Sequence, residues 1–389
     1  MLLAREQIHS ESRGHGTQGP FGPNDSRSIG HLVAYCCIFS PSVQSEWDEL
    51  LILSRMPNLA TPLVRVERGG VEEAVHLGHL AVVDSGGRLQ ASLGDPGRVT
   101  YFRSCAKPFQ AIGSLGTGIA ARYGLGAEHI AIMAASHNGE PRHVEIVRDL
   151  LRRAGIAESD LQCGAHWPYY EPAATAARHQ MDEPLAVFNN CSGKHAGMLA
   201  AARAFGAPLD TYLDPVHPVQ ERIRDVIEAF TGCPPAEIHY GIDGCSAPNA
   251  AVPLAAMART FAALLTATDE TPTTVAAAMT QHPYLIGGTD RFDTRLMEVT
   301  RGRLLAKGGA AGAHCTGDRR SGRGLAVKLD SGDGTWTAVA VMAALQQLGW
   351  LDLGEREALT SFAMPTLRNH KRVAVGTVRP VFRELVTAV

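Results

Sequence analysis

A serine and a lysine three residues apart, Ser104 and Lys107, could form a nucleophile and its base. On a helical turn, positions i and i+3 lie on one face, so the Lys107 amine can reach the Ser104 hydroxyl. A serine hydroxyl needs an adjacent base to attack at neutral pH, and a lysine serves once desolvation or a nearby cation lowers its pKa. The spacing alone is a weak signal, because a helix cap followed by a solvated lysine produces the same pattern.

Further reactive side chains are concentrated in short segments. Each combines hydroxyl, amide, thiol or charged groups with glycine, which permits sharp turns and close approach of a ligand to the backbone. These segments occupy residues 101–108, 135–140, 189–197 and 241–249. A fifth element, Lys-Gly-Gly at 307–309, places a lysine on an expected strand. The density of such groups favours a catalytic interpretation of the serine–lysine pair.

In this order, the segments resemble the zinc-containing, serine-type L-asparaginase family typified by rhizobial enzymes. The most specific strings are Cys-Ser-Gly-Lys-His-Ala-Gly at 191–197 and Gly-Ile-Asp-Gly-Cys-Ser-Ala-Pro at 241–248, and the resemblance runs from about Pro57 to about Val381. It implies hydrolysis of L-asparagine to L-aspartate and ammonia. The implied fold is similar to that of serine β-lactamases and penicillin-binding proteins, which also carry a Ser-x-x-Lys element and a Lys-Thr-Gly strand.

The resemblance implies a role for each reactive residue. Ser104 with Lys107 matches a first catalytic serine–lysine pair, and Ser136 with Lys307 matches a second. The expected zinc ligands are Cys191, Lys194 and Cys245, with Asp243 close to the metal. The expected substrate-binding residues are Arg103, His137, Asn138, Lys194, Asp243 and Arg291.

Some features keep alternatives open. Family members usually have Glu after Lys-Gly-Gly-Ala, where this chain has Ala311, and the segment 313–320 is unlike the usual short apolar link. One alternative is a glutaminase or another amide hydrolase on the same fold, and a second is a non-catalytic binding protein. A lysine binds zinc only as the neutral amine, so Lys194 could instead stay charged and bind the substrate carboxylate. Similarly, Ser136 could cap a helix rather than relay a proton.

Length and composition exclude several classes of protein. A chain of 389 residues with 45% apolar content can bury one large core or two intimate ones. Its net charge of −3 gives no electrostatic case for binding nucleic acid or an anionic membrane. Eight cysteines without paired spacings, and no visible export signal, predict reduced thiols in a cytoplasmic protein. We expect a homodimer with a small-molecule substrate, zinc and no organic cofactor.

The order of the expected elements indicates an α/β (α+β) fold. Strand patterns at 63–66, 76–83 and 88–93 precede helical periodicity at 111–123, 143–154, 194–205, 219–230 and 250–265, before strands at 303–307 and 325–329 and a helix at 335–348. We therefore expect a domain at 57–389, in which 57–110 and 285–389 form an antiparallel sheet. A mostly helical part, 111–284, would pack beside it. Residues 1–56 lack any periodicity, and we expect a poorly ordered extension there.

Overall fold

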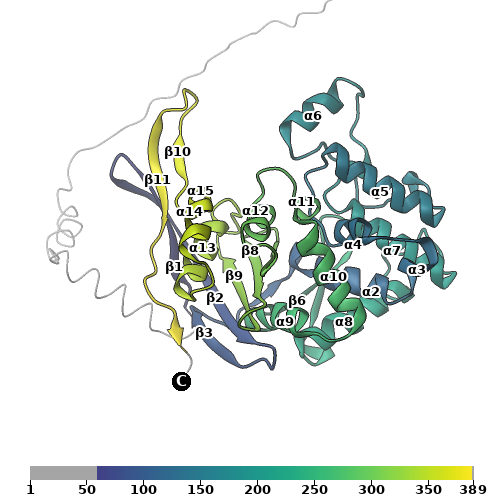
Figure 1. The fold of residues 1–389 in the computed structure, drawn as a ribbon, viewed down its shortest axis with the longest axis horizontal. Coiled ribbons are helices and arrows are strands. Elements are labelled where there is room, and N and C mark those ends of the chain that lie inside the picture. Colours follow the sequence, from purple (N-terminus) through teal and green to yellow (C-terminus); the bar gives the residue numbers. More distant parts are fainter. Residues whose placement is uncertain (1–58, 388–389) are drawn as a thin grey trace, which may run out of the picture. The chain divides into compact units, whose positions relative to one another are not determined.

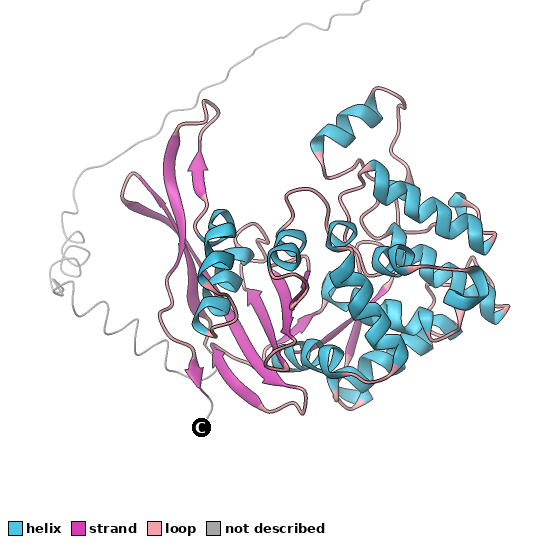
Figure 2. Ribbon diagram, in the orientation of Figure 1, coloured by secondary structure: helices cyan, strands magenta, loops and turns pink. Residues whose placement is uncertain are grey.

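The computed structural model of the chain describes residues 59–387, so the extension expected at residues 1–56 lies outside the described part. Within that part, one antiparallel sheet is built by both ends of the chain (Figures 1 and 2). The strands along its main path run in the order β10-β11-β1-β2-β9-β8-β7, and β3 joins β2 to β12. They are β1 (Thr61–Arg68), β2 (Val71–Asp84), β3 (Leu89–Leu93), β7 (Leu304–Gly308), β8 (Ala313–Asp318), β9 (Arg323–Leu329), β10 (Thr366–Arg368), β11 (Ala374–Pro380) and β12 (Val386–Thr387).

Local sequence explains how this sheet begins. The hairpin between β1 and β2 turns at Gly69 and Gly70, whose φ angles of 57° and 83° favour glycine. The second half of β2 then becomes fully buried, because it lies between β9 and β3. The expected α/β fold, with an antiparallel sheet from both chain ends and a helical part, is confirmed.

Most of the helices lie between β4 (Val99–Tyr101) and β7 in the sequence (Figure 1). They are α2 (Lys107–Leu115), α3 (Ile119–Tyr123), α4 (Ala127–Met133), α5 (Pro141–Ala154), α6 (Glu171–Arg178), α7 (Ser192–Phe205), α8 (Pro218–Thr231), α9 (Leu254–Thr266), α10 (Glu270–Gln281), α11 (Pro283–Ile286) and α12 (Phe292–Val299), followed after β9 by α13 (Thr337–Gln347), α14 (Leu353–Ala358) and α15 (Thr360–Ala363). Helix α9 packs on β2, β8 and β9. None of the helices described is long and apolar enough to cross a membrane.

Two expected elements differ in the structure. The run 250–265 is not one helix: its first residues belong to β6 (Pro248–Pro253), which pairs with β4 (Val99–Tyr101) and β5 (His239–Ile242), and α9 begins at Leu254. The run 111–123 is broken by Gly118, whose φ of 80° ends the helical geometry. The unusual segment 313–320 contains a fully buried strand, β8.

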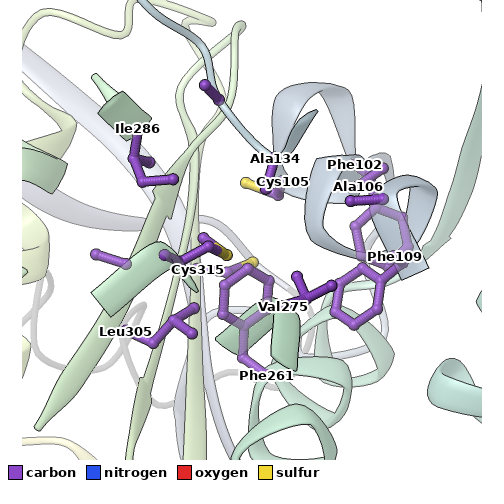
Figure 3. Close-up of a cluster of buried hydrophobic side chains, with 14 of the residues drawn as sticks. Phe102, Cys105, Ala106, Phe109, Ala134, Phe261, Val275, Ile286, Leu305 and Cys315 are labelled. Carbon is purple, nitrogen blue, oxygen red and sulfur yellow. The ribbon is translucent and has the colours of Figure 1, made fainter. Parts of the chain in front are cut away.

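A buried core joins the sheet to the turn that carries Ser104 (Figure 3). This turn is a 3₁₀ helix, η1 (Arg103–Ala106), which leads directly into α2. Phe109 of α2 packs edge-on against Phe261 of α9, with ring centroids 5.7 Å apart. Cys105 of the turn donates a hydrogen bond to the Lys307 carbonyl of β7 at 3.1 Å. The core therefore fixes the first reactive segment against the strand that carries Lys307.

Candidate functional site

Lys107 is the residue at which three of the reactive segments meet. It lies in the first turn of α2 with only 1% of its surface exposed. Its Nζ donates hydrogen bonds to Ser136 Oγ at 2.9 Å, to the Ala135 carbonyl at 2.6 Å and to the Asn190 carbonyl at 2.9 Å. Burial lowers the pKa of this amine. Lys107 thus becomes a more available base than a lysine in water.

Glycines in the segment 189–197 bring these partners together. A side chain at Gly193 would lie 2.2 Å from the Ile132 carbonyl, and one at Gly197 would lie 2.6 Å from Met133. Their absence lets the start of α7 pack directly against the end of α4. Asn190 precedes α7 and Ser136 follows α4, so this close approach places both residues around the Lys107 amine.

The second lysine, Lys307, contacts the same serine from β7. Its Nζ lies 2.9 Å from Ser136 Oγ and donates a hydrogen bond to the Gly308 carbonyl at 2.7 Å. The side chain is fully buried, and burial lowers the pKa of Lys307 to about 8. The Ser136 hydroxyl therefore lies between two amines, and burial lowers the pKa of both. Ser136 caps none of the helices that the structure describes.

Ser104 has a different environment. It is half-buried, and among residues 59–387 no hydrogen bond joins its side chain to Lys107. Lys107 instead turns toward the acceptors around Ser136, which local spacing could not reveal. The preceding residue, Arg103, has a φ of 49°, a strained value for a long side chain. Such strain is concentrated at functional sites.

The predicted metal ligands also lie together. Lys194 of α7 donates a hydrogen bond from Nζ to Cys245 Sγ at 2.9 Å, and Cys191 precedes the same helix. A hydrogen bond from Cys245, supported by Lys107 and Lys194, lowers the pKa of Cys191 well below its usual value despite burial. The same hydrogen bond and burial raise the pKa of Cys245, whereas the two sulfurs raise the pKa of Lys194 against burial. In the free cluster, a Cys191 thiolate therefore lies beside a charged Lys194 amine.

Asp243 links this sulfur cluster to the Ser104 turn. Arg103 donates a hydrogen bond from Nε to Asp243 Oδ1 at 2.9 Å. Because the carboxylate holds the guanidinium, the two residues fix the loop after β5 against the turn. Arg103 is therefore engaged by Asp243 in the described structure.

The remaining predicted substrate-binding residues separate into two kinds. His137 is fully buried, lies 3.0 Å from Ser192 Oγ through Nε2 and stacks on His143 at 5.2 Å. Burial keeps its pKa well below the usual value, so it packs as a neutral ring. Arg291 is exposed and donates a hydrogen bond to Asn138 Oδ1 at 3.3 Å. This contact places Arg291 beside Asn138, which follows Ser136 by two positions in the chain.

Two features of the site escaped sequence reasoning. One is a carboxylate–histidine pair next to Lys307, formed by Asp293 and His314. The other is a signal in the composition: the chain has only five lysines among 36 basic residues, and three of the five are buried in this site. An arginine-rich chain that retains lysines in its interior indicates positions at which a neutral amine is useful, since arginine does not lose its proton in proteins.

Comparison with known proteins shows which family the chain belongs to. The model of the family described as L-asparaginase II matches residues 64–380. No curated protein matches the chain. Solved structures that resemble it include a β-lactamase from Mycobacterium bovis, at 17% identity over 74% of this chain and 95% of that one with a TM-score of 0.36. Another is EstCE1, a hydrolase with promiscuous acyltransferase activity, at 10% identity over 81% and 97% with a TM-score of 0.30.

Proposed function

Because the chain belongs to the L-asparaginase II family, we propose that it hydrolyses L-asparagine to L-aspartate and ammonia through a serine acyl-enzyme. The observation that carries the proposal is the Ser136 hydroxyl, held 2.9 Å from both the Lys107 and the Lys307 amines. Two buried amines on one hydroxyl form a path along which a proton can move. Ser104, which is half-buried, lies three residues from one of these amines.

In the proposed first step, Ser104 attacks the side-chain amide carbon of asparagine. Its hydroxyl proton passes to neutral Lys107, whose pKa is lowered by burial. The amine exchanges its contact with Ser136 for one with Ser104 by rotation of its side chain. Collapse of the tetrahedral intermediate transfers a proton to the leaving nitrogen, releases ammonia and leaves an aspartyl ester on Ser104.

In the second step, water hydrolyses this ester. Ser136 and Lys307 supply the route by which a proton leaves the attacking water and returns to Ser104. Ser136 suits this relay because its oxygen already lies 2.9 Å from both amines. It suits the nucleophile's role less, because only 6% of its surface is exposed.

Assays of ammonia release from L-asparagine and L-glutamine, together with the colour change on ring opening of a chromogenic β-lactam, test this function directly. We expect turnover of L-asparagine above that of the other two compounds. Preferred turnover of glutamine or the β-lactam would assign another amide hydrolase to the same site. Thermal stabilisation by L-asparagine without ammonia release would indicate a binding protein.

The pH dependence follows from Lys307. Its pKa of about 8 means that the amine is mostly charged below that pH and mostly neutral above it. If Lys307 accepts a proton in the relay, kcat/KM should rise with pH through about 8 and then level off. Initial rates between pH 6 and pH 10, in buffers of constant ionic strength, measure this. A profile that is flat across the range would show that Lys307 does not act as a base.

The sulfur cluster fits the zinc that the family resemblance implies. Two thiols and an amine are a donor set that zinc accepts, with a fourth position left for water or substrate. Cys191, Lys194 and Cys245 would hold the ion, and bound zinc would act as an electropositive centre for the substrate. Lys194 and Cys245 must lose protons to bind it, because the free cluster keeps both of them protonated. In the alternative, Lys194 stays charged and binds the substrate carboxylate.

We expect about one equivalent of zinc in the purified protein, and Cys191→Ser or Cys245→Ser should lose most of it, because a hydroxyl is a poor zinc ligand at neutral pH. KM should increase more than kcat falls, since the serine–lysine pairs carry the bond breaking. Elemental analysis and steady-state kinetics measure both effects. Cys233→Ser is the matched control, as this partly exposed thiol has no contact with Lys194 among the described residues. If the purified protein contained no metal and still hydrolysed L-asparagine, Lys194 would instead stay charged and bind the substrate carboxylate.

A further inference from the structure

Lys307 has a second polar neighbour besides Ser136. The carboxylate of Asp293, in the first turn of α12, places Oδ2 3.9 Å from the Lys307 Nζ. The Asp293 side chain is 12% exposed and that of Lys307 is fully buried. Opposite charges at such a distance interact far more strongly away from water than at a surface.

Asp293 is held in this position from two sides. The Gly308 backbone N–H donates a hydrogen bond to Oδ2 at 2.6 Å, and His314 Nε2 lies 3.0 Å from Oδ1. Burial opposes the charge of this carboxylate, but the hydrogen bond with His314 and the nearby Lys307 hold the pKa of Asp293 well below its usual range. Asp293 is therefore an anion at neutral pH.

The strand register explains why His314 can do this. In the pairing of β7 with β8, His314 lies directly opposite Gly308, the residue that follows Lys307. Thr316, two residues further along β8, has its Oγ1 3.3 Å from His314 Nδ1 and fixes the ring orientation. The segment that departs from the usual family pattern thus supplies the group that contacts Asp293.

Few other charged or titratable groups face Lys307. Those that influence it are Lys107 from α2, Arg291 from the segment before α12, Cys105 from the 3₁₀ turn, Cys315 opposite it on β8, Asp293 from α12 and, through Asp293, His314 from β8. Lys107 and Arg291 oppose a positive charge on Lys307. Asp293 is the carboxylate in this set.

We propose that Asp293 is the counter-ion that receives Lys307 when this lysine gains a proton, and that His314 holds Asp293 in place. The proposal deepens the proposed function and rests on it for the role of Lys307. When the Ser136 hydroxyl gives its proton to neutral Lys307, the ammonium forms beside a carboxylate that is already ionised. The proton returns by the same path. Asp293 is a positioning residue that acts through Lys307, as a buried aspartate stabilises the protonated base of a Ser-His-Asp triad.

NMR of protein labelled with [ε-¹³C]lysine tests the counter-ion without any turnover. The chain has five lysines, so five signals are expected, and Lys307→Met identifies the one of interest. Asp293→Asn should lower the midpoint of the Lys307 titration by about one pH unit or more, because a neighbouring anion favours the charged amine. The amide can still accept from Gly308 and contact His314. Asp293→Ser, which also keeps an acceptor for Gly308, gives the same test if the asparagine variant does not fold.

Two controls separate charge from structure. Asp318 lies on β8, and its buried carboxylate accepts a hydrogen bond from Arg303. Asp318→Asn removes that charge and should leave the Lys307 midpoint unchanged. His314→Gln keeps a hydrogen-bond donor toward Asp293 and should also leave it near the native value. An unchanged midpoint in Asp293→Asn would overturn the proposal, whatever the activity of the protein.

Steady-state kinetics give a second test of the counter-ion, independent of the NMR titration. In Asp293→Asn, kcat should fall about tenfold or more, and the rise of kcat/KM should move to lower pH, because Lys307 would lose its proton more easily. A purely structural role for Asp293 would lower the amount of folded enzyme and leave the position of the rise unchanged. Failure of the wild-type protein to hydrolyse asparagine would refute the proposed function, while the titration would still report on the counter-ion.

Discussion

Replacing Ser104 by alanine is expected to lower kcat for L-asparagine by about 10⁴- to 10⁶-fold, because loss of the nucleophile removes the covalent route. The hydroxyl makes no hydrogen bond to another described residue, so the fold should tolerate its removal. Steady-state ammonia release and a thermal melt measure the two effects. Ser114→Ala is the matched control on α2, since among residues 59–387 its hydroxyl bonds only the Gln110 carbonyl of the same helix.

The same experiment in Ser136→Ala tests the division of roles between the two serines. Loss of a proton relay is expected to cost about 10²- to 10⁴-fold, which is less than loss of the nucleophile. If Ser104→Ala kept more than about a tenth of the activity while Ser136→Ala lost nearly all of it, Ser136 would be the nucleophile. Lys107 and Lys307 would then both act on that serine.

Lys307→Met should reduce kcat by about 10²- to 10⁴-fold, the usual contribution of a positioned general acid or base. Methionine preserves much of the side-chain volume but removes the amine that lies 2.9 Å from Ser136 Oγ. Rapid-quench kinetics should show that release of the first ammonia is slowed less than hydrolysis of the ester. Lys328→Met on neighbouring β9 is the control, because within the described part of the chain that amine bonds only backbone carbonyls.

A near-native rate in Lys307→Met would contradict the relay. Ser136 would then exchange its proton with Lys107 alone, and the buried amine of Lys307 would have only a structural role. The departure from the family pattern at Ala311 would in that case mark a site whose second pair no longer works.

Parts of the fold and site could be predicted because their signals are local. Gly69 and Gly70 require a hairpin turn, and the apolar periodicity of 143–154 matches α5 closely. The Lys-Gly-Gly element predicted a lysine on a strand, and Lys307 lies on β7. These features depend on residues that are close together in the sequence, so a local pattern is enough to predict them.

Other parts depend on residues far apart in the chain. The Lys107 side chain points toward the Ala135 and Asn190 carbonyls, to which its amine donates hydrogen bonds. Every residue has a backbone carbonyl, so residue types in a sequence do not indicate which carbonyls will act as acceptors. An apolar run such as 250–252 suits a helix or a buried strand equally well, and pairing with β4 and β5 decides for the strand. The position of His314 follows from the register of β8 on β7.

Trapping of the acyl-enzyme tests the central claim most directly. Lys307→Met, which should accumulate the ester, is mixed with L-asparagine, quenched in acid and digested, and the peptides are weighed by mass spectrometry. We predict that the peptide containing Ser104 gains the mass of one aspartyl group and loses it on treatment with hydroxylamine. An aspartyl adduct on Ser136, or ammonia release in the first turnover without any adduct, would contradict the account.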